Sequence, residues 1–213
     1  MGGAIGATEI RVLARGAEAD ILEAEWMGMR VVIKRRPPRA YLNPQLDFRV
    51  RYRRTVREAR ALHDAKSAGV PTPAVYFVDP MRAEIFMEMV VGRRLKELLE
   101  AERRIDLLGT VGEYLGILHR NGIIHGDPTT SNFILSAGRL YAIDFGLSLR
   151  SRSPRDQATD LHVIKEALES YHGDLPEGAL GRLLEGYSRT FDGARESLRW
   201  LGRLEASGRY KGG

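Results

Sequence analysis

The chain has no cysteine among its 213 residues. Disulfide bonds and thiolate-bound metals are therefore excluded, and the composition is compatible with a reducing cytoplasm. The sequence also lacks any apolar run long enough to span a bilayer, and residues 1–8 lack the charged and apolar regions of a signal peptide. These absences predict a cytoplasmic protein. A length of 213 residues is enough for one sizeable core or two small lobes.

Lysine is scarce: the chain has only five, at positions 34, 66, 96, 165 and 211, whereas arginine is frequent. The net charge of +5 and the isoelectric point near 9.6 suggest an anionic partner such as nucleic acid, although ATP-binding clefts also raise the isoelectric point. A lysine in such a chain is a candidate for a role that requires a compact ammonium group and that the planar guanidinium group of arginine would not fill.

Lys34 is the candidate for such a task. Residues 29–34 alternate and then become continuously apolar, which predicts a strand that ends at Lys34. An ammonium group there can reach the α- and β-phosphates of ATP if an acid from the next helix holds it, and Glu58 is the candidate acid. Taken alone, Lys34 is equally well explained as an exposed lysine at a strand end.

Two further motifs follow in the order of a protein-kinase phosphotransfer site. His125-Gly126-Asp127 precedes Asn132 by the expected spacing, and Asp144-Phe145-Gly146 follows a second apolar run. In such a site Asp127 orients the attacking hydroxyl or water, or accepts a proton from it. Asn132 and Asp144 hold the magnesium ions that bridge the ATP phosphates. The expected cofactors are therefore ATP and Mg²⁺.

Two weaker features complete the nucleotide site. The turn that contains Gly16 and Ala17 lies where kinases have a glycine-rich phosphate flap, but only one glycine is present, so an ordinary hairpin turn is as good an explanation. Residues 87–92 are expected to form the hinge between the lobes. Adenine would hydrogen-bond to the backbone there, around Glu88 and Met89.

The expected fold is α+β: a minimal bilobal kinase-like fold with a small β-rich N-lobe over residues 1–91 and a mainly helical C-lobe over 92–213. The hydrophobic pattern predicts strands at 10–14, 19–25, 29–35, 74–78, 84–89, 123–124 and 140–143, and helices at 46–68, 94–101, 106–121, 157–171, 176–190 and 193–207. Residues 36–44 are expected to form a loop.

Four finer predictions concern the helices. Gly69 should cap the long helix of the N-lobe, and the glycines at 109, 112 and 116 should allow close helix packing. His119 is expected to be a packed histidine bonded to backbone. Asp174 and Glu177 should form a capping box for the helix at 176–190.

The C-lobe departs from conventional protein kinases at two places. Gly126 replaces the arginine that usually follows the histidine and binds a phosphorylated activation loop. Only residues 147–156 separate the D-F-G motif from the next predicted helix, and no A-P-E motif follows. With a reduced activation segment there is almost no peptide-docking platform, so ATP hydrolysis or slow phosphotransfer is favoured over rapid peptide phosphorylation.

Several segments together resemble the small atypical kinase/ATPase family of the KEOPS complex, which is RIO-like. They are Arg53-Arg54-Thr55-Val56-Arg57-Glu58, Gly69-Val70-Pro71-Thr72-Pro73, His125-Gly126-Asp127, Thr129-Thr130-Ser131-Asn132 and Asp156-Gln157-Ala158-Thr159-Asp160. The chain departs from this family at Pro128, where leucine is usual, and in a less basic tail.

The resemblance implies a role in making threonylcarbamoyladenosine in tRNA. The family member acts chiefly as an ATPase, with serine/threonine kinase activity also described. It binds the threonylcarbamoyl-transferring subunit through its C-lobe and other KEOPS subunits through its N-lobe, and direct tRNA contact is possible. The resemblance also implies that Asp160 braces the catalytic loop from the following helix.

Two other functions fit part of the same pattern. Small-molecule phosphotransferases of the aminoglycoside or choline type also use H-G-D with an asparagine five residues later. The Asp144-Phe145-Gly146 motif and the short chain count against them. A nucleotide-binding scaffold without turnover is the second alternative, and the presence of all five expected active-site side chains counts against it.

Overall fold

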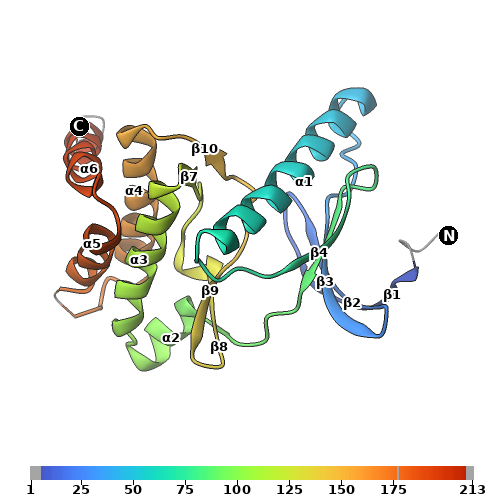
Figure 1. The fold of residues 1–213 in the computed structure, drawn as a ribbon, viewed down its shortest axis with the longest axis horizontal. Helices are drawn as coiled ribbons and strands as arrows, with labels where there is room; N and C mark the ends of the chain where they lie inside the picture. Colours follow the sequence, from blue (N-terminus) through green and yellow to red (C-terminus); the bar gives the residue numbers. More distant parts are fainter. Residues whose placement is uncertain (1–5, 177, 210–213) are drawn as a thin grey trace. The chain divides into compact units, whose positions relative to one another are not determined.

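The computed structural model describes residues 6–176 and 178–209. The chain divides into two compact units: the first comprises residues up to His63 together with Pro73–Val90, and the second comprises Asp64–Thr72 together with the residues from Val91 onward. Figure 1 shows the elements of each unit. Within the described residues, no helix is both long enough and apolar enough to cross a membrane.

The first unit is built on a five-stranded antiparallel sheet in the order β1-β2-β3-β5-β4. Its strands are β1 (Thr8–Arg15), β2 (Asp20–Trp26), β3 (Met29–Arg35), β4 (Val75–Asp79) and β5 (Glu84–Glu88). All five strands were predicted to within two residues at each end. Strand β1 is an edge strand whose residues are all exposed, whereas β3 and β5 form the buried centre.

An aromatic cluster fills the core of this sheet. Trp26 lies with its ring centroid 5.4 Å from that of Phe86 and 6.0 Å from that of Phe77. The remaining core side chains come from alternate positions of β2 and β3, among them Leu22, Ala24, Val31 and Ile33. The alternation explains why β3 can bury its apolar side chains and still present Lys34 on the opposite face of the sheet.

Helix α1 (Pro44–Ser67) follows the sheet strands β1–β3 in the chain. The Asn43 side-chain oxygen accepts hydrogen bonds from the backbone N–H groups of Gln45 at 3.0 Å and Leu46 at 3.3 Å, so Asn43 caps the helix. The predicted loop through Pro44 was therefore one residue too long, because proline is favoured in the first turn. Gly69 ends the segment with φ +101°, as predicted.

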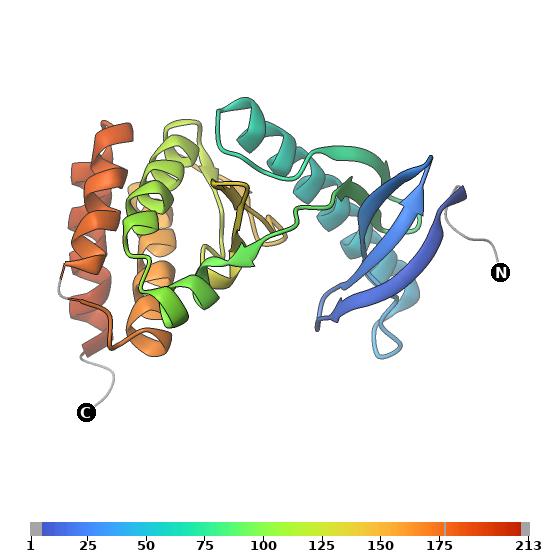
Figure 2. The same cartoon turned by 90° about the horizontal axis from the view of Figure 1, so that it is seen from below.

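The second unit is mainly helical. Its helices are α2 (Leu95–Glu102), α3 (Asp106–Arg120), α4 (Pro154–Tyr171), α5 (Ala179–Thr190) and α6 (Ala194–Arg209). Its strands are short: β6 (Arg93–Arg94), β7 (Ile123–Ile124), β8 (Phe133–Ser136), β9 (Arg139–Ala142) and β10 (Leu149–Arg150). Helices α3 to α6 lie side by side in both views (Figures 1 and 2).

Two helix starts differ from prediction by three residues, more than any other. Helix α4 begins three residues early because Ser153 is extended and Pro154 occupies the first turn. Helix α5 begins three residues late, after Gly178 with φ +95°. The predicted capping box included Glu177, which lies outside the described residues, and the Asp174 carboxylate instead pairs with Arg103 at 2.7 Å.

Close packing of α3 against α5 depends on Gly112 and Gly116, as predicted, whereas a Cβ at Gly109 would make only an ordinary contact, 3.8 Å from the Arg182 carbonyl oxygen. A Cβ atom added at Gly112 would lie 1.9 Å from the Leu183 carbonyl oxygen, and one at Gly116 would lie 2.1 Å from Thr190 Oγ1. On the facing helix, a Cβ at Gly186 would lie 2.0 Å from the Gly109 carbonyl oxygen. Any side chain at these positions would therefore separate the two helices.

His119 lies inside this helix pair and is fully buried. Its Nδ1 lies 2.8 Å from the Tyr187 hydroxyl on α5, and its Nε2 lies 3.1 Å from Asp160 Oδ2 on α4. The prediction of a packed histidine is confirmed, but its partners are side chains and not backbone groups. Burial raises the pKa of the Tyr187 hydroxyl, so this phenol stays protonated.

Candidate active site

In the first unit, the structure brings Lys34 and Glu58 together. Lys34 Nζ lies 2.7 Å from Glu58 Oε1, and both side chains are at most 7% exposed. Strand β3 presents the lysine and α1 presents the glutamate, 24 residues apart in the chain. A buried ammonium fixed in this way is oriented to bind an oxyanion, which an exposed and unpaired strand-end lysine would not be.

Arg36 is a third member of this cluster. Its Nη2 donates to Glu58 Oε2, so each carboxylate oxygen of Glu58 receives one cation. The Arg36 side chain is only 2% exposed, and its Nη1 lies 3.5 Å from Thr55 Oγ1. Two buried cations thus share one buried carboxylate, and a phosphate is a suitable further ligand for them.

The turn that contains Gly16 and Ala17 joins β1 to β2 and is anchored to other parts of the same unit. The Gly16 N–H donates to the Ala19 carbonyl at 3.0 Å, so that group is already used within the turn. Arg39 Nη2 donates to the Ala17 carbonyl at 3.3 Å. Glu18 pairs with Arg54 on α1 at 2.7 Å, and the hydrogen bond from Arg54 lowers the pKa of Glu18. The turn is therefore held to α1 by Arg54 and to the loop between β3 and α1 by Arg39.

Glu88 and Met89 lie at the end of β5, where the hinge was expected. The Glu88 N–H donates to the Ala74 carbonyl at 2.8 Å, and the Ala74 N–H donates to Glu88 Oε2 at 3.0 Å. This double contact fixes the end of the strand but uses the Glu88 amide. A base that binds at Glu88 would therefore have to use its carbonyl, and Met89 follows outside the strand.

In the second unit, the structure brings Asp127 and Asn132 together. Asn132 Nδ2 donates to the Asp127 carbonyl at 2.8 Å and to Asp127 Oδ2 at 2.9 Å. The short 3₁₀ turn Thr130–Asn132 closes the loop between the two residues. With its amide nitrogen committed to Asp127, Asn132 turns its Oδ1 away, and that oxygen is a suitable ligand for a hard cation.

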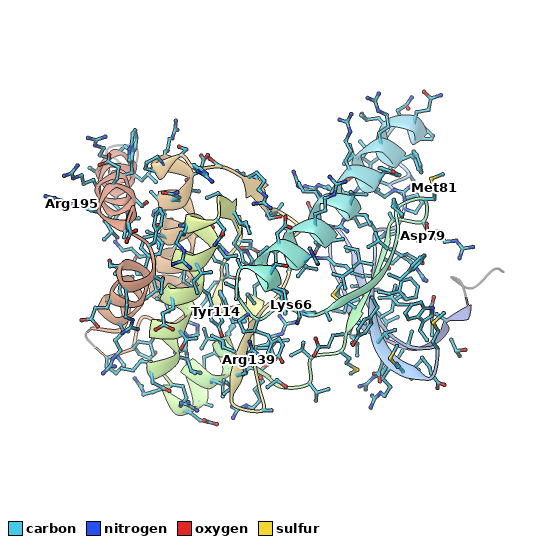
Figure 3. All side chains as sticks on the ribbon, in the orientation of Figure 1. Lys66, Asp79, Met81, Tyr114, Arg139 and Arg195 are labelled. Atoms are coloured by element: carbon cyan, nitrogen blue, oxygen red, sulfur yellow. The ribbon has the colours of Figure 1, made fainter. Side chains whose placement is uncertain are left out.

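Asp144 follows β9 with φ +60°, a left-handed conformation that turns the chain sharply. The Ile143 N–H donates to the Asn132 carbonyl at 2.9 Å, which places the backbone of Asp144 next to that of Asn132. The Tyr114 hydroxyl, labelled in Figure 3, donates to the Leu140 carbonyl at 3.0 Å and ties β9 to α3. Asp144 is exposed, and its Oδ1 accepts from the Gly146 N–H at 3.1 Å.

These oxygens suit a magnesium ion that is bound together with phosphates. Within the described residues there is no group of three or more His, Cys, Asp or Glu side chains able to hold a metal by themselves. Mg²⁺ in nucleotide sites typically takes only one or two protein ligands and completes its shell with phosphate oxygens and water. Asn132 and Asp144 supply that number.

Asp160 holds the loop before Asp127 in place. Its Oδ2 accepts from the His125 N–H at 2.7 Å, and its Oδ1 accepts from the Gly126 N–H at 2.8 Å. The Asp160 side chain is fully buried on α4, and His119 contacts it from α3. The bracing role expected for Asp160 is thus confirmed. Three helices contribute to it, because Asp160 on α4 contacts His119 on α3, which contacts Tyr187 on α5.

His125 is buried against Phe145, with ring centroids 4.5 Å apart, and its Nδ1 accepts from the Asp127 N–H at 3.3 Å. Burial lowers its pKa, although nearby carboxylates oppose the shift. Below about pH 6.5 the His125 side chain is protonated in the unfolded chain, whereas its burial disfavours protonation in the folded chain. We expect the free energy of unfolding to fall as the pH drops below about 6.5, by no more than about 1.4 kcal/mol per pH unit.

Denaturant unfolding at several pH values measures this slope. His125→Asn should flatten it, whereas His63→Asn, a change at an exposed histidine, should leave it as in the native chain. Equal slopes for the two variants would contradict the prediction.

Gly126 is required by the loop that carries Asp127. Its φ is +85°, and an added Cβ would lie 2.3 Å from the Leu147 carbonyl oxygen. The residue that most kinases have as arginine must therefore be glycine here. We expect Gly126→Ala to destabilise the fold by more than the roughly 1–2 kcal/mol cost of left-handed backbone alone, and to slow ATP turnover.

Gly138→Ala is the matched control for this substitution. Its φ is +79°, but an added Cβ would meet nothing within 4 Å. The difference between the two variants in the free energy of unfolding, measured with denaturant, gives the cost of the steric overlap with Leu147. Equal losses would mean that backbone strain alone explains the glycine.

Sequence reasoning missed two residues of the site. Arg36 lies two residues after Lys34, a spacing that places alternate strand residues on one face, and this was an available signal. Tyr187 had no local signal, because its contact with His119 joins residues 68 positions apart. The other predicted residues lie in the elements from which they were expected.

Comparison with known proteins identifies the family. A family model of the RIO domain matches residues 43–174. The KEOPS complex subunit Bud32 of Pyrococcus abyssi is 40% identical, over 95% of this chain and 97% of that protein. A probable bifunctional tRNA threonylcarbamoyladenosine biosynthesis protein of Methanothermobacter thermautotrophicus is 41% identical over 93% of this chain, which spans only 36% of that relative's length.

The structure of the Rio2 kinase–ADP/Mg²⁺–phosphoaspartate complex from Chaetomium thermophilum has the same fold. Its TM-score is 0.64 and its identity 18%, over 92% of this chain and 70% of that one. The expected minimal kinase-like fold is therefore correct. These relatives favour the KEOPS-type interpretation over a phosphotransferase of the aminoglycoside or choline type. The chain belongs to the RIO-domain family of atypical kinases, in the group that includes the KEOPS complex subunit Bud32.

Proposed function

We propose that this chain is a Mg²⁺- and ATP-dependent atypical kinase/ATPase that supports formation of threonylcarbamoyladenosine in tRNA in the cytoplasm. The observation that carries the proposal is the 40% identity to the KEOPS complex subunit Bud32 over nearly the whole of both chains. The paired side chains in each unit support it, because one pair offers a buried cation to phosphate and the other offers oxygens to water and magnesium.

In this proposal Lys34 contacts the α- and β-phosphates of ATP, and Glu58 orients its ammonium group. The turn at Gly16 and Ala17 covers the phosphates, and the backbone at Glu88 and Met89 binds adenine. The 2.7 Å ion pair between Lys34 and Glu58 supports these roles in the first unit, because it prepares the cation before the nucleotide arrives.

Asp127, Asn132 and Asp144 supply the remaining chemistry. Asp127 orients the attacking water or hydroxyl and accepts its proton. Asn132 and Asp144 would hold a magnesium ion, whose charge would offset that of the phosphates. The hydrogen bond from Asn132 Nδ2 to Asp127 Oδ2 supports this division of roles. The donor keeps the Asp127 carboxylate oriented, and the opposite side of the Asn132 amide is left for the metal.

Water is the favoured acceptor for the γ-phosphoryl group. Between Phe145-Gly146 and the start of α4 at Pro154 only seven residues intervene, and the short strand β10 takes two of them. A segment of this length leaves no platform to position a peptide hydroxyl, and positioning supplies most of the catalysis in phosphoryl transfer. A serine or threonine presented by a bound partner is the second acceptor class.

The partner in this proposal is a threonylcarbamoyltransferase that binds the second unit, and other KEOPS subunits bind the first. Relatives named as bifunctional tRNA threonylcarbamoyladenosine biosynthesis proteins support it. This chain matches only 36–37% of the length of those relatives from Methanothermobacter thermautotrophicus and Methanocaldococcus jannaschii. The rest of each relative's chain is long enough to carry the second activity that its name, "bifunctional", implies.

Two measurements test the proposal. ATP hydrolysis by the full chain should rise when a threonylcarbamoyltransferase of a KEOPS complex is added. Expression of the chain in cells that lack their own Bud32 should also restore threonylcarbamoyladenosine, measured by mass spectrometry of tRNA nucleosides. If the partner changes nothing and a free peptide is phosphorylated rapidly, the proposed function is wrong.

A further inference from the structure

Helix α1 carries three exposed arginines without partners. Arg49, Arg53 and Arg60 are exposed, and none forms a hydrogen bond or an ion pair with any part of the chain that the structure describes. Their spacings of four and seven residues place them within about 40° of one another around the helix axis. We call Arg49, Arg53 and Arg60 the arginine stripe. In Figure 3, several side chains that project from α1 end in nitrogen.

The acidic residues of α1 do not neutralise this stripe. Asp47 and Glu58 are buried, and they pair with Arg51 and with Lys34 and Arg36. Asp64, near the end of the helix, pairs with Arg150. The carboxylates of the helix therefore pair with other cations, and the three charges of the stripe face solvent. Arg54, which is on the same helix but is not part of the stripe, pairs with Glu18.

The dimensions of the stripe match a chain of phosphates. With a rise of 1.5 Å per residue, Arg49 and Arg53 are about 6 Å apart along the axis, and Arg49 and Arg60 about 17 Å apart. A guanidinium group binds a phosphate through two parallel hydrogen bonds. Tyr52, which is 40% exposed, lies beside Arg49 on the helix and offers a ring on which an unpaired base can stack.

The opposite face of α1 argues against a membrane as the ligand. A helix that lies in a membrane surface must insert an apolar face, but Ala59, Leu62 and Ala65 are buried within the protein. We propose that the arginine stripe is an RNA-binding surface that contacts backbone phosphates of the tRNA substrate. This inference rests on the proposed function for the identity of the RNA.

A matched pair of triple variants tests the stripe. The first variant replaces Arg49, Arg53 and Arg60 by glutamine. The control replaces Arg120, Arg155 and Arg195, which are exposed on α3, α4 and α6, by glutamine and so removes the same total charge. Fluorescence anisotropy with an unmodified tRNA transcript, over 50–200 mM salt, measures affinity and its salt dependence. ATP hydrolysis by the full chain should be unchanged in both variants.

We expect the stripe variant to bind the transcript at least about tenfold more weakly, with a salt slope reduced by roughly 2–3, because about three phosphate contacts are lost. The control should lose much less. Equal losses in the two variants would mean that only net charge matters, and no loss would mean that the stripe does not touch RNA. A stripe variant that loses binding to phosphatidylserine vesicles but not to the transcript would also overturn the proposal.

The outcome is separable from that of the proposed function. If the native chain restores threonylcarbamoyladenosine in cells but the stripe variant binds tRNA normally, only the stripe proposal fails. If the native chain restores no modification while the stripe variant still loses RNA affinity relative to its control, the function fails and the RNA-binding surface stands.

Discussion

Asp127→Asn should lower the rate of ATP turnover by about 10²- to 10⁴-fold, the usual contribution of a positioned acid or base. The asparagine keeps the shape of the side chain and an oxygen that can accept from Asn132 Nδ2, so the loop should hold its conformation. What is lost is the negative charge that orients the attacking group and takes its proton. Single-turnover hydrolysis of radiolabelled ATP measures the rate, and fluorescence titration with a labelled ATP measures nucleotide affinity.

The expected pattern is a loss of rate with nearly unchanged affinity, because Asp127 acts on the attacking group and the phosphates are held by other residues. Asp192→Asn, at an exposed aspartate near the start of α6, is the matched control and should keep full turnover. If Asp127→Asn retained full turnover, Asp127 would have no part in catalysis. If it abolished turnover but left tRNA modification in cells intact, the chain would act as a nucleotide-binding scaffold.

Much of the fold could be predicted because the local signals were consistent. The alternating pattern of residues 29–35 predicted a strand, and the structure shows it paired on both sides in the sheet. Glu58 could be linked to Lys34 because kinase-like motifs fix their order and approximate spacing, and the ion pair is present. The glycines of α3 predicted close packing, although the facing helix could not be identified from them alone.

What could not be predicted depends on contacts between residues far apart in the chain. The partners of His119 lie on two other helices, so a histidine bonded to backbone was the simpler expectation. The start of α5 was misplaced because Pro176 resembles a first-turn proline, whereas Gly178 adopts the left-handed conformation that precedes the helix. The spacing of Arg36 from Lys34 indicated the face on which Arg36 lies, but its burial depends on where α1 packs.

Glu58→Ala should destabilise the fold by about 3–5 kcal/mol, because it leaves two buried cations without their shared anion. Lys34 is 7% exposed and Arg36 is 2% exposed, so neither can turn to solvent without moving its strand or loop. Each carboxylate oxygen of Glu58 holds one of them, and a neutral substitute can compensate neither charge. Urea unfolding followed by circular dichroism measures the loss. Glu97→Ala, which removes a glutamate from an exposed position of α2, is the control.

The reason for keeping such a cluster can be tested by removing all of it. Replacing Lys34 and Arg36 by methionine and Glu58 by leucine exchanges three buried charges for apolar groups of similar size, which is often neutral or stabilising. The triple variant should therefore recover most of the stability that Glu58→Ala loses, yet bind Mg-ATP poorly because no cation meets the phosphates. A triple variant as unstable as Glu58→Ala would show that the charges themselves hold the first unit together. Recovered stability with lost ATP binding would show that the cluster is retained for nucleotide binding, at no benefit to the fold.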